Sequence, residues 1–138
     1  MNFYDGDLNT FVGIVIMMEY SPSDIADRYT IVKLKINRLK DKSFRDEYLV
    51  LNKEIEKLIS AGMLKKAQIA RLYRVNSKIW DLEAHIGNYS KGNKNFKKIA
   101  ILALQVRKWN TVRTNIKSEI VSETKMGFRD SKKFYFTG

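Results

Sequence analysis

Apolar residues recur at the spacing of an α-helix in four separate segments, and this periodicity restricts the chain to a helical fold. The four segments span residues 22–40, 44–60, 64–86 and 96–123. Ser21 and Pro22 form a helix N-cap signal, while Gly62 and Gly87 are placed to end the second and third segments. Because the connections are short, we expect an all-α fold, an antiparallel four-helix bundle over residues 21–124.

The first helical segment is apolar on two sides. At about 100° per residue, Ile25, Tyr29 and Val32 share one face of this helix. Ile31 and Leu34 lie on the opposite face. A helix that buries both faces needs neighbours on both, so we expect the first helix to lie at the centre of the bundle.

The two ends of the chain differ from the bundle in composition. Residues 1–20 contain an apolar run at positions 11–18, which is shorter than the about 20 residues that cross a bilayer. We interpret residues 1–20 as a short strand or apolar arm. We interpret residues 125–138 as a basic, aromatic tail. Because the apolar run would otherwise remain in contact with water, it either packs on its own bundle or forms an interface between copies of the chain, and we favour a homo-oligomer. With no signal-peptide pattern and no membrane partner expected, the prediction is a cytoplasmic protein.

Composition excludes several classes of site. The chain has no cysteine and one histidine, so a thiolate or histidine-rich metal site is not expected. The sequence contains no nucleophile–histidine–acid pattern and no glycine-rich phosphate loop. We therefore name no catalytic residue, metal or cofactor, and catalysis is the least favoured interpretation. The abundance of Lys, Asn and Ile is typical of AT-rich genomes, such as those of some bacteriophages.

Net charge is +11 and unevenly distributed. Residues 1–20 hold three acids and no base, which gives −3. Residues 88–138 hold 12 bases and three acids, which gives +9. A basic half indicates an anionic partner, although a solubilising lysine surface has the same composition.

Polar and charged residues interrupt three of the apolar stripes, where they are costly unless they are paired or used. In chain order they are Asp27, Lys35, Arg38, Asn76, Glu83, Asn110, Arg113 and Lys117. Trp80 lies beside the second group, and Arg28 follows Asp27. Three helices that each bring such a set indicate one shared polar site inside the bundle.

Three sequence blocks resemble those of a family of small bacterial and phage proteins. The block SPSDIADRYTIVKLKINRLKD is similar to the family's opening at Ser21, Pro22, Asp27, Thr30, Ile31, Lys35 and Arg38, with Arg28 where the family usually has Lys. The block YRVNSKIWDLEAHI is similar through Val75, Asn76, Trp80 and Glu83, and VRKWNTVRTNIKSEI through Asn110, Arg113, Lys117 and Ile120. The resemblance covers about residues 20–135. It implies the helical fold and the polar set, and it carries no assigned activity.

The polar set has two interpretations. Two acids against four bases leave a surplus of +2, which would suit a doubly charged anion whose ring stacks on Trp80, such as a nucleotide, a cyclic dinucleotide or a phosphosugar. A phage protein of this kind could sequester a host nucleotide signal. In the second interpretation the same residues form a structural ion-pair network that fixes the register between helices and binds nothing.

A further alternative places the function in the fourth helix and the tail, which would bind nucleic acid or an acidic protein. The bases concerned are Lys94, Lys97, Lys98, Arg107, Lys108, Lys125, Arg129, Lys132 and Lys133. Phe134 and Tyr135 would be available to stack on bases. No helix-turn-helix or zinc-finger pattern supports sequence-specific recognition.

Overall fold

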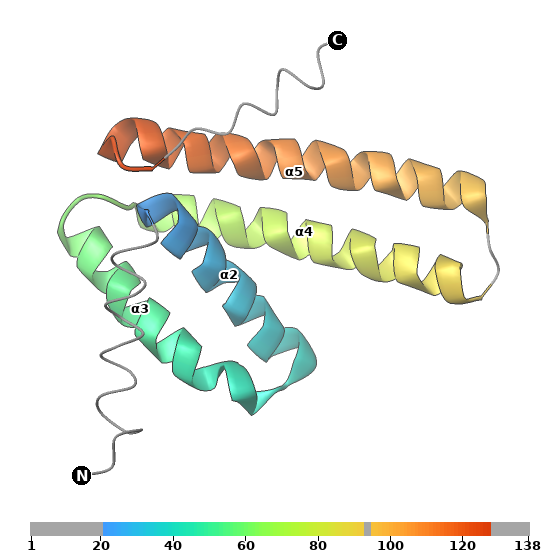
Figure 1. Ribbon diagram of the computed structural model, residues 1–138, viewed down its shortest axis with the longest axis horizontal. Helices are drawn as coiled ribbons and strands as arrows, with labels where there is room; N and C mark the ends of the chain where they lie inside the picture. The colour runs from blue at the N-terminus through green and yellow to red at the C-terminus, as the bar shows by residue number, and fades with distance from the viewer. Residues whose placement is uncertain (1–20, 93–94, 128–138) are drawn as a thin grey trace.

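The computed structural model describes residues 21–92 and 95–127, and these residues form four α-helices and one short 3₁₀ turn (Figure 1). The helices are α2 (Pro22–Leu39), α3 (Arg45–Ser60), α4 (Lys66–Lys91) and α5 (Phe96–Thr124), with the 3₁₀ turn η1 (Lys42–Phe44) before α3. The prediction of an all-helical fold is confirmed for this part of the chain. The predicted N-terminal strand or arm, and the tail from residue 128 onward, lie outside the described residues.

The helix ends follow local sequence signals in most places. Ser21 caps α2, since its Oγ accepts a hydrogen bond from the backbone N–H of Asp24 at 3.5 Å, and Pro22 occupies the first turn. Gly62 follows α3 with φ +74°, a backbone conformation that L side chains rarely adopt, and this agrees with its predicted role as a stop. At the start of α4, the backbone N–H of Lys65 donates to the Gln68 side chain at 2.9 Å.

The predicted end of the third helix at Gly87 is wrong, and residues 88–91, which the sequence placed in the connection to the fourth helix, are helical. Gly87 lies inside α4, which ends at Lys91 and has Gly92 as its C-cap. Glycine costs about 1 kcal/mol relative to alanine in a helix interior. Continued backbone hydrogen bonding and the half-buried side chains of Ile86 and Tyr89 on either side outweigh that cost.

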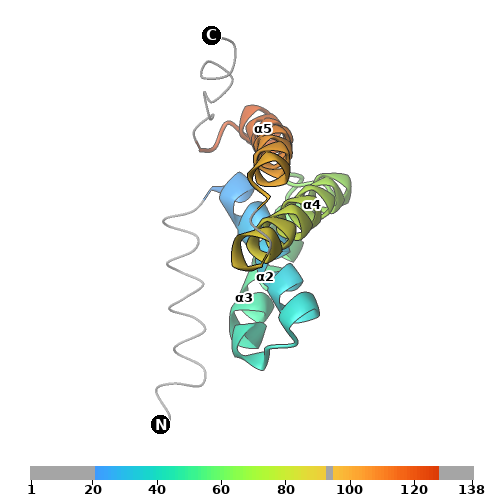
Figure 2. The same ribbon diagram turned by 90° about the vertical axis from the view of Figure 1, so that its right-hand side faces the viewer.

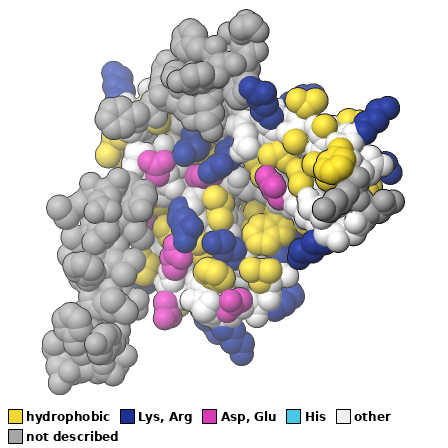
Figure 3. All heavy atoms as spheres, turned by 45° about the vertical axis from the view of Figure 1, so that its right-hand side comes forward, with side chains coloured by type: hydrophobic (Ala, Val, Ile, Leu, Met, Phe, Trp, Pro, Cys, Tyr) yellow, Lys and Arg dark blue, Asp and Glu magenta, His cyan; other side chains and the backbone are white. Residues whose placement is uncertain are grey.

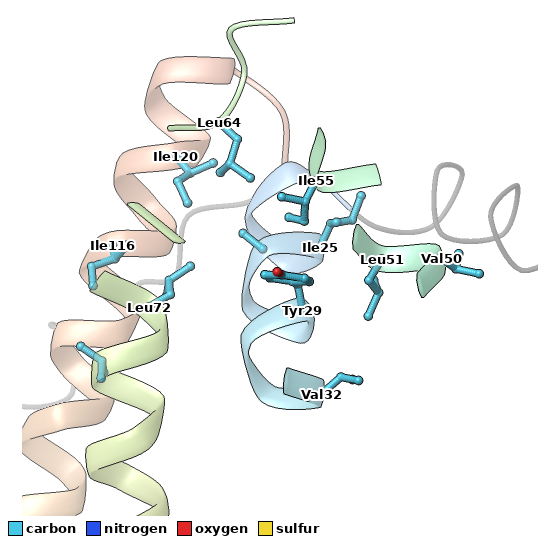
Figure 4. Packing of buried hydrophobic residues seen from close by; sticks show 12 residues of the cluster. Ile25, Tyr29, Val32, Val50, Leu51, Ile55, Leu64, Leu72, Ile116 and Ile120 are labelled. Atoms are coloured by element: carbon cyan, nitrogen blue, oxygen red, sulfur yellow. The ribbon is translucent and has the colours of Figure 1, made fainter. Parts of the chain in front are cut away.

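Helix α2 is the centre of the fold, as its two apolar faces predict. Figures 1 and 2 both place it between α3 and the pair formed by α4 and α5, and it contacts each of the other three helices. Val32 is 0% exposed and Leu34 1% exposed, so both faces of α2 are buried. Figure 4 shows the core, in which Tyr29 of α2, Leu51 of α3 and Leu72 of α4 gather with their neighbours.

Helices α4 and α5 form a hairpin that is longer than the rest of the molecule. They have 26 and 29 residues against 18 in α2, or roughly 39 and 44 Å against 27 Å at 1.5 Å per residue. One end of the hairpin therefore extends past α2 and α3 (Figure 1). None of the described helices combines the length and apolar character needed to cross a membrane.

Candidate functional site

The carboxylate of Asp27 is the centre of a polar cluster that joins three helices. Asp27 is only 5% exposed, on the side of α2 that faces α4 and α5. Arg113 of α5 binds it with two N–H groups, Nε donating to Oδ1 at 2.9 Å and Nη2 donating to Oδ2. Asn76 of α4 donates from Nδ2 to the same Oδ1 at 3.0 Å. The predicted convergence of three helices on one polar site is therefore present at these residues.

Three further side chains complete the cluster. Thr30 Oγ1 accepts a second hydrogen bond from Asn76 Nδ2 at 2.8 Å and donates to the backbone carbonyl of Asp27 at 2.7 Å. Lys117 Nζ lies 3.1 Å from Asp24 Oδ1 and 3.9 Å from Asp27 Oδ2. We refer to Asp24, Asp27, Thr30, Asn76, Arg113 and Lys117 as the Asp27 cluster.

The two charged partners at the centre shift each other's pKa. Burial by itself raises the pKa of Asp27, but the hydrogen bonds and positive charge of Arg113, with help from Asn76 and Lys117, outweigh burial and lower the pKa below 3.8. The hydrogen bond to Asp27 raises the pKa of Arg113 against the opposing effect of burial. Both groups are therefore charged at neutral pH.

The Asp27 cluster is balanced within itself. Two carboxylates, Asp24 and Asp27, face two cations, Arg113 and Lys117. In residues 21–92 and 95–127, no buried side-chain nitrogen or oxygen lacks a hydrogen-bond partner. This is the composition expected of a structural ion-pair network, and it leaves no surplus positive charge for an anion.

The remaining bases of the predicted set lie elsewhere. Arg28 is exposed and pairs with Glu47 of α3 through two hydrogen bonds of 2.7 and 3.1 Å. Arg38 lies toward the other end of α2, where it binds Asp81 at 2.6 Å and Ser77 at 2.7 Å. Lys35 Nζ lies 4.9 Å from the centre of the Phe44 ring. The structure does not bring these three bases to Asp27.

The last three predicted residues lie near the cluster without joining it. Trp80 and Glu83 line a pocket that also touches Asn76 and Arg113. Asn110 is half-buried on α5, one turn before Arg113. Asp24 is the one charged member of the cluster that the sequence pattern did not predict. Its position one turn before Asp27 on α2 is the signal that could have revealed it.

The outer side of α5 carries a second unusual surface. Ile101 is 48% exposed and Leu104 is 64% exposed, and Lys97 and Lys108 flank them at spacings that place all four on one side of the helix. We call these four residues the outer face of α5. Figure 3 shows hydrophobic side chains at the surface of the hairpin end that extends past α2 and α3, with Lys and Arg side chains beside them. In the sequence, Lys97 and Lys108 are predicted as bases of the fourth helix, and no motif singles out Ile101 and Leu104.

The other predicted bases of this region are distributed as follows. Lys98 and Arg107 are exposed on α5, and Lys98 Nζ lies 5.6 Å from the centre of the Tyr89 ring. Lys125 forms the C-cap of α5 with φ 56°. The remaining members lie outside the described residues: Lys94, Arg129, Lys132, Lys133, Phe134 and Tyr135.

No family model, curated protein or solved structure matches this chain. The family resemblance drawn from the three sequence blocks therefore stays a prediction. Within residues 21–92 and 95–127, no group of three or more His, Cys, Asp or Glu side chains is arranged to hold a metal ion.

Proposed function

We propose that this protein is a non-enzymatic binding module whose outer face of α5 docks an acidic, amphipathic helix of a partner protein. The observation that carries the proposal is the exposure of Ile101 and Leu104 on a helix that already uses its opposite side to pack on α4. Val106, on that opposite side, is 9% exposed. A helix that is apolar on two sides but covered on one has a surface suited to a second partner.

The charges of α5 select the kind of partner. Lys97 and Lys108 flank the apolar pair, and the first acidic residue of α5 is Glu119. A second copy of this chain would bring like charges into contact, whereas an acidic helix would bring opposite ones. Nucleic acid would satisfy the lysines but not the apolar centre, because its affinity comes mainly from phosphate contacts.

The geometry gives less support to the interpretation that the Asp27 cluster binds a small anion. Arg113 and Lys117 already pair with Asp27 and Asp24. An incoming phosphate would have to displace a carboxylate from a partly buried site, which leaves that carboxylate without its partner. The outer face of α5 requires no such displacement.

The test uses a synthetic, fluorescein-labelled helical peptide with leucines on one face and glutamates on the other. We expect this peptide to bind the full chain and to bind more weakly as salt is raised. A peptide with lysine in place of every glutamate should bind far more weakly. Fluorescence anisotropy at several salt concentrations measures both affinities.

Variants locate the binding surface. Ile101→Ser and Leu104→Ser should each weaken binding of the glutamate peptide by about tenfold, which corresponds to about 1.4 kcal/mol. Leu49→Ser is the matched control, since Leu49 is 50% exposed but lies on α3. Equal binding of the two peptides, an unchanged affinity in Ile101→Ser and Leu104→Ser, or tighter binding of a duplex DNA oligonucleotide at the same face would overturn the proposal.

A further inference from the structure

A separate pocket of about 510 Å³ lies where α2, α4 and α5 meet. Its apolar walls are Ile31 and Leu34 of α2 together with Ile79 and Trp80 of α4. The size is within the range of pockets that hold small molecules, roughly 300–1,000 Å³. The pocket is open to solvent on α4, so a ligand could enter without unfolding a helix.

The polar side chains around this pocket differ in whether they already form hydrogen bonds or ion pairs with other residues. Asn76 commits both hydrogens of its amide to Asp27 and Thr30. Arg113 is paired with Asp27, which offsets its charge. Glu83 is exposed and makes no hydrogen bond or ion pair with any residue that the structure describes. The uncompensated charge at the pocket is therefore negative.

Trp80 and Glu83 are three residues apart on α4, so their side chains lie on the same side of the helix. An aromatic face next to a carboxylate attracts an organic cation in two ways, through the ring quadrupole and through the opposite charge. The attraction to Trp80 is strongest where apolar walls exclude water from the cation. Ile31, Leu34 and Ile79 would contact an apolar body attached to that cation.

We propose that this pocket is a binding site for a small amphipathic organic cation. Its ammonium group lies between the Trp80 ring and the Glu83 carboxylate, and its alkyl or aromatic body lies against α2. The sequence predicted an anionic ligand, whereas this pocket favours a cationic one. The reason is that Arg113 and Lys117 already pair with Asp27 and Asp24. It stands independently of the outer face of α5, which is built from other residues.

The experiment compares two probes with the same tail and opposite charge, octyltrimethylammonium and octyl sulfate, below the concentrations at which they form micelles. The full chain is labelled with ¹⁵N, and the indole N–H signal of Trp80 is assigned with a Trp80→Leu variant. The ammonium should shift this signal saturably, and the sulfate should not. Tighter binding of the sulfate at Trp80, or no binding of the ammonium, would contradict the proposal.

A charge-neutral variant separates specific binding from detergent-like adsorption. Glu83→Gln keeps the size of the side chain and should weaken ammonium binding by about tenfold. Glu56→Gln is the matched control, because Glu56 is an exposed glutamate on α3 away from the pocket. Both positions are exposed, so both variants should melt at the temperature of the unmodified chain. Equal ammonium affinity in Glu83→Gln and Glu56→Gln would show that Glu83 plays no part.

Discussion

The guanidinium of Arg113 binds both carboxylate oxygens of Asp27 although the two residues are 86 positions apart in the sequence. This paired contact joins the first described helix to the last. Asn76 donates to the same carboxylate from α4, so one side chain of α2 links three helices. A bidentate contact of this kind fixes both the distance and the orientation between the helices, whereas a single charge contact does not fix the orientation.

We predict that Asp27→Asn lowers the free energy of unfolding by about 2 kcal/mol. Breaking a fully buried ion pair costs roughly 3–5 kcal/mol, and the Arg113 side chain is 30% exposed, which reduces the penalty. Urea unfolding followed by circular dichroism measures the change. Asp81→Asn is the control, since it removes the exposed partner of Arg38 and should leave the urea midpoint almost unchanged. Similar effects of the two substitutions would show that the Asp27 cluster is not a major contribution to stability.

The lowered pKa of Asp27 gives the stability a defined pH dependence. Because its pKa is lower in the folded state than the ordinary value of 3.8, the unfolded state takes up the proton first as pH falls. The stabilisation from Asp27 is therefore complete above pH 3.8 and is lost as pH falls through the folded-state pKa. We expect the difference in unfolding free energy between the unmodified chain and Asp27→Asn to be constant near neutral pH and to shrink below pH 3.8. A difference that grows in acid would contradict the pairing with Arg113.

Two glycine substitutions should act in opposite directions. Gly87→Ala should raise the free energy of unfolding by about 0.5–1 kcal/mol, because the position is inside α4 and a Cβ there meets nothing within 4 Å. Gly62→Ala should lower it by about 1 kcal/mol, because Gly62 has φ +74°. Thermal unfolding of both variants gives the comparison. A destabilised Gly87→Ala would indicate that the third helix ends at this glycine after all.

The hydroxyl of Tyr29 should lose its proton at a higher pH than an ordinary tyrosine. Burial, followed by the interaction with Tyr48 and the charge of Glu56, raises its pKa to about 12, and the two tyrosine rings stack at 5.5 Å. The folded state therefore holds this proton longer than the unfolded state, and the corresponding stability is lost as pH rises from 10 toward 12. Absorbance at alkaline pH should show a phenolate component near pH 12 that is missing in Tyr29→Phe. Loss of a component near pH 10 instead would place Tyr29 in contact with water.

The pattern of residues predicted the Asp27 cluster better than it predicted the whole polar set. Asp27, Asn76, Arg113 and Lys117 meet as expected. Arg38 shares nearly the same angular position on α2 as Asp27, but it is 11 residues farther along, or about 16 Å at 1.5 Å per residue. Helical periodicity gives the side of a helix on which a residue lies, and it does not give the point at which another helix crosses.

The sequence by itself determined the all-helical character, the positions of most helix ends and the central place of α2, because these follow from local capping and from side-chain periodicity. Only the tertiary structure decided which charges pair, because pairing depends on crossing points between helices that are distant in the chain. It also decided that α4 continues through Gly87, where continued backbone hydrogen bonding and the half-buried side chains of Ile86 and Tyr89 outweigh a local preference to end the helix. The exposed side of α5 became visible for the same reason, since a residue is exposed only relative to what the rest of the fold covers.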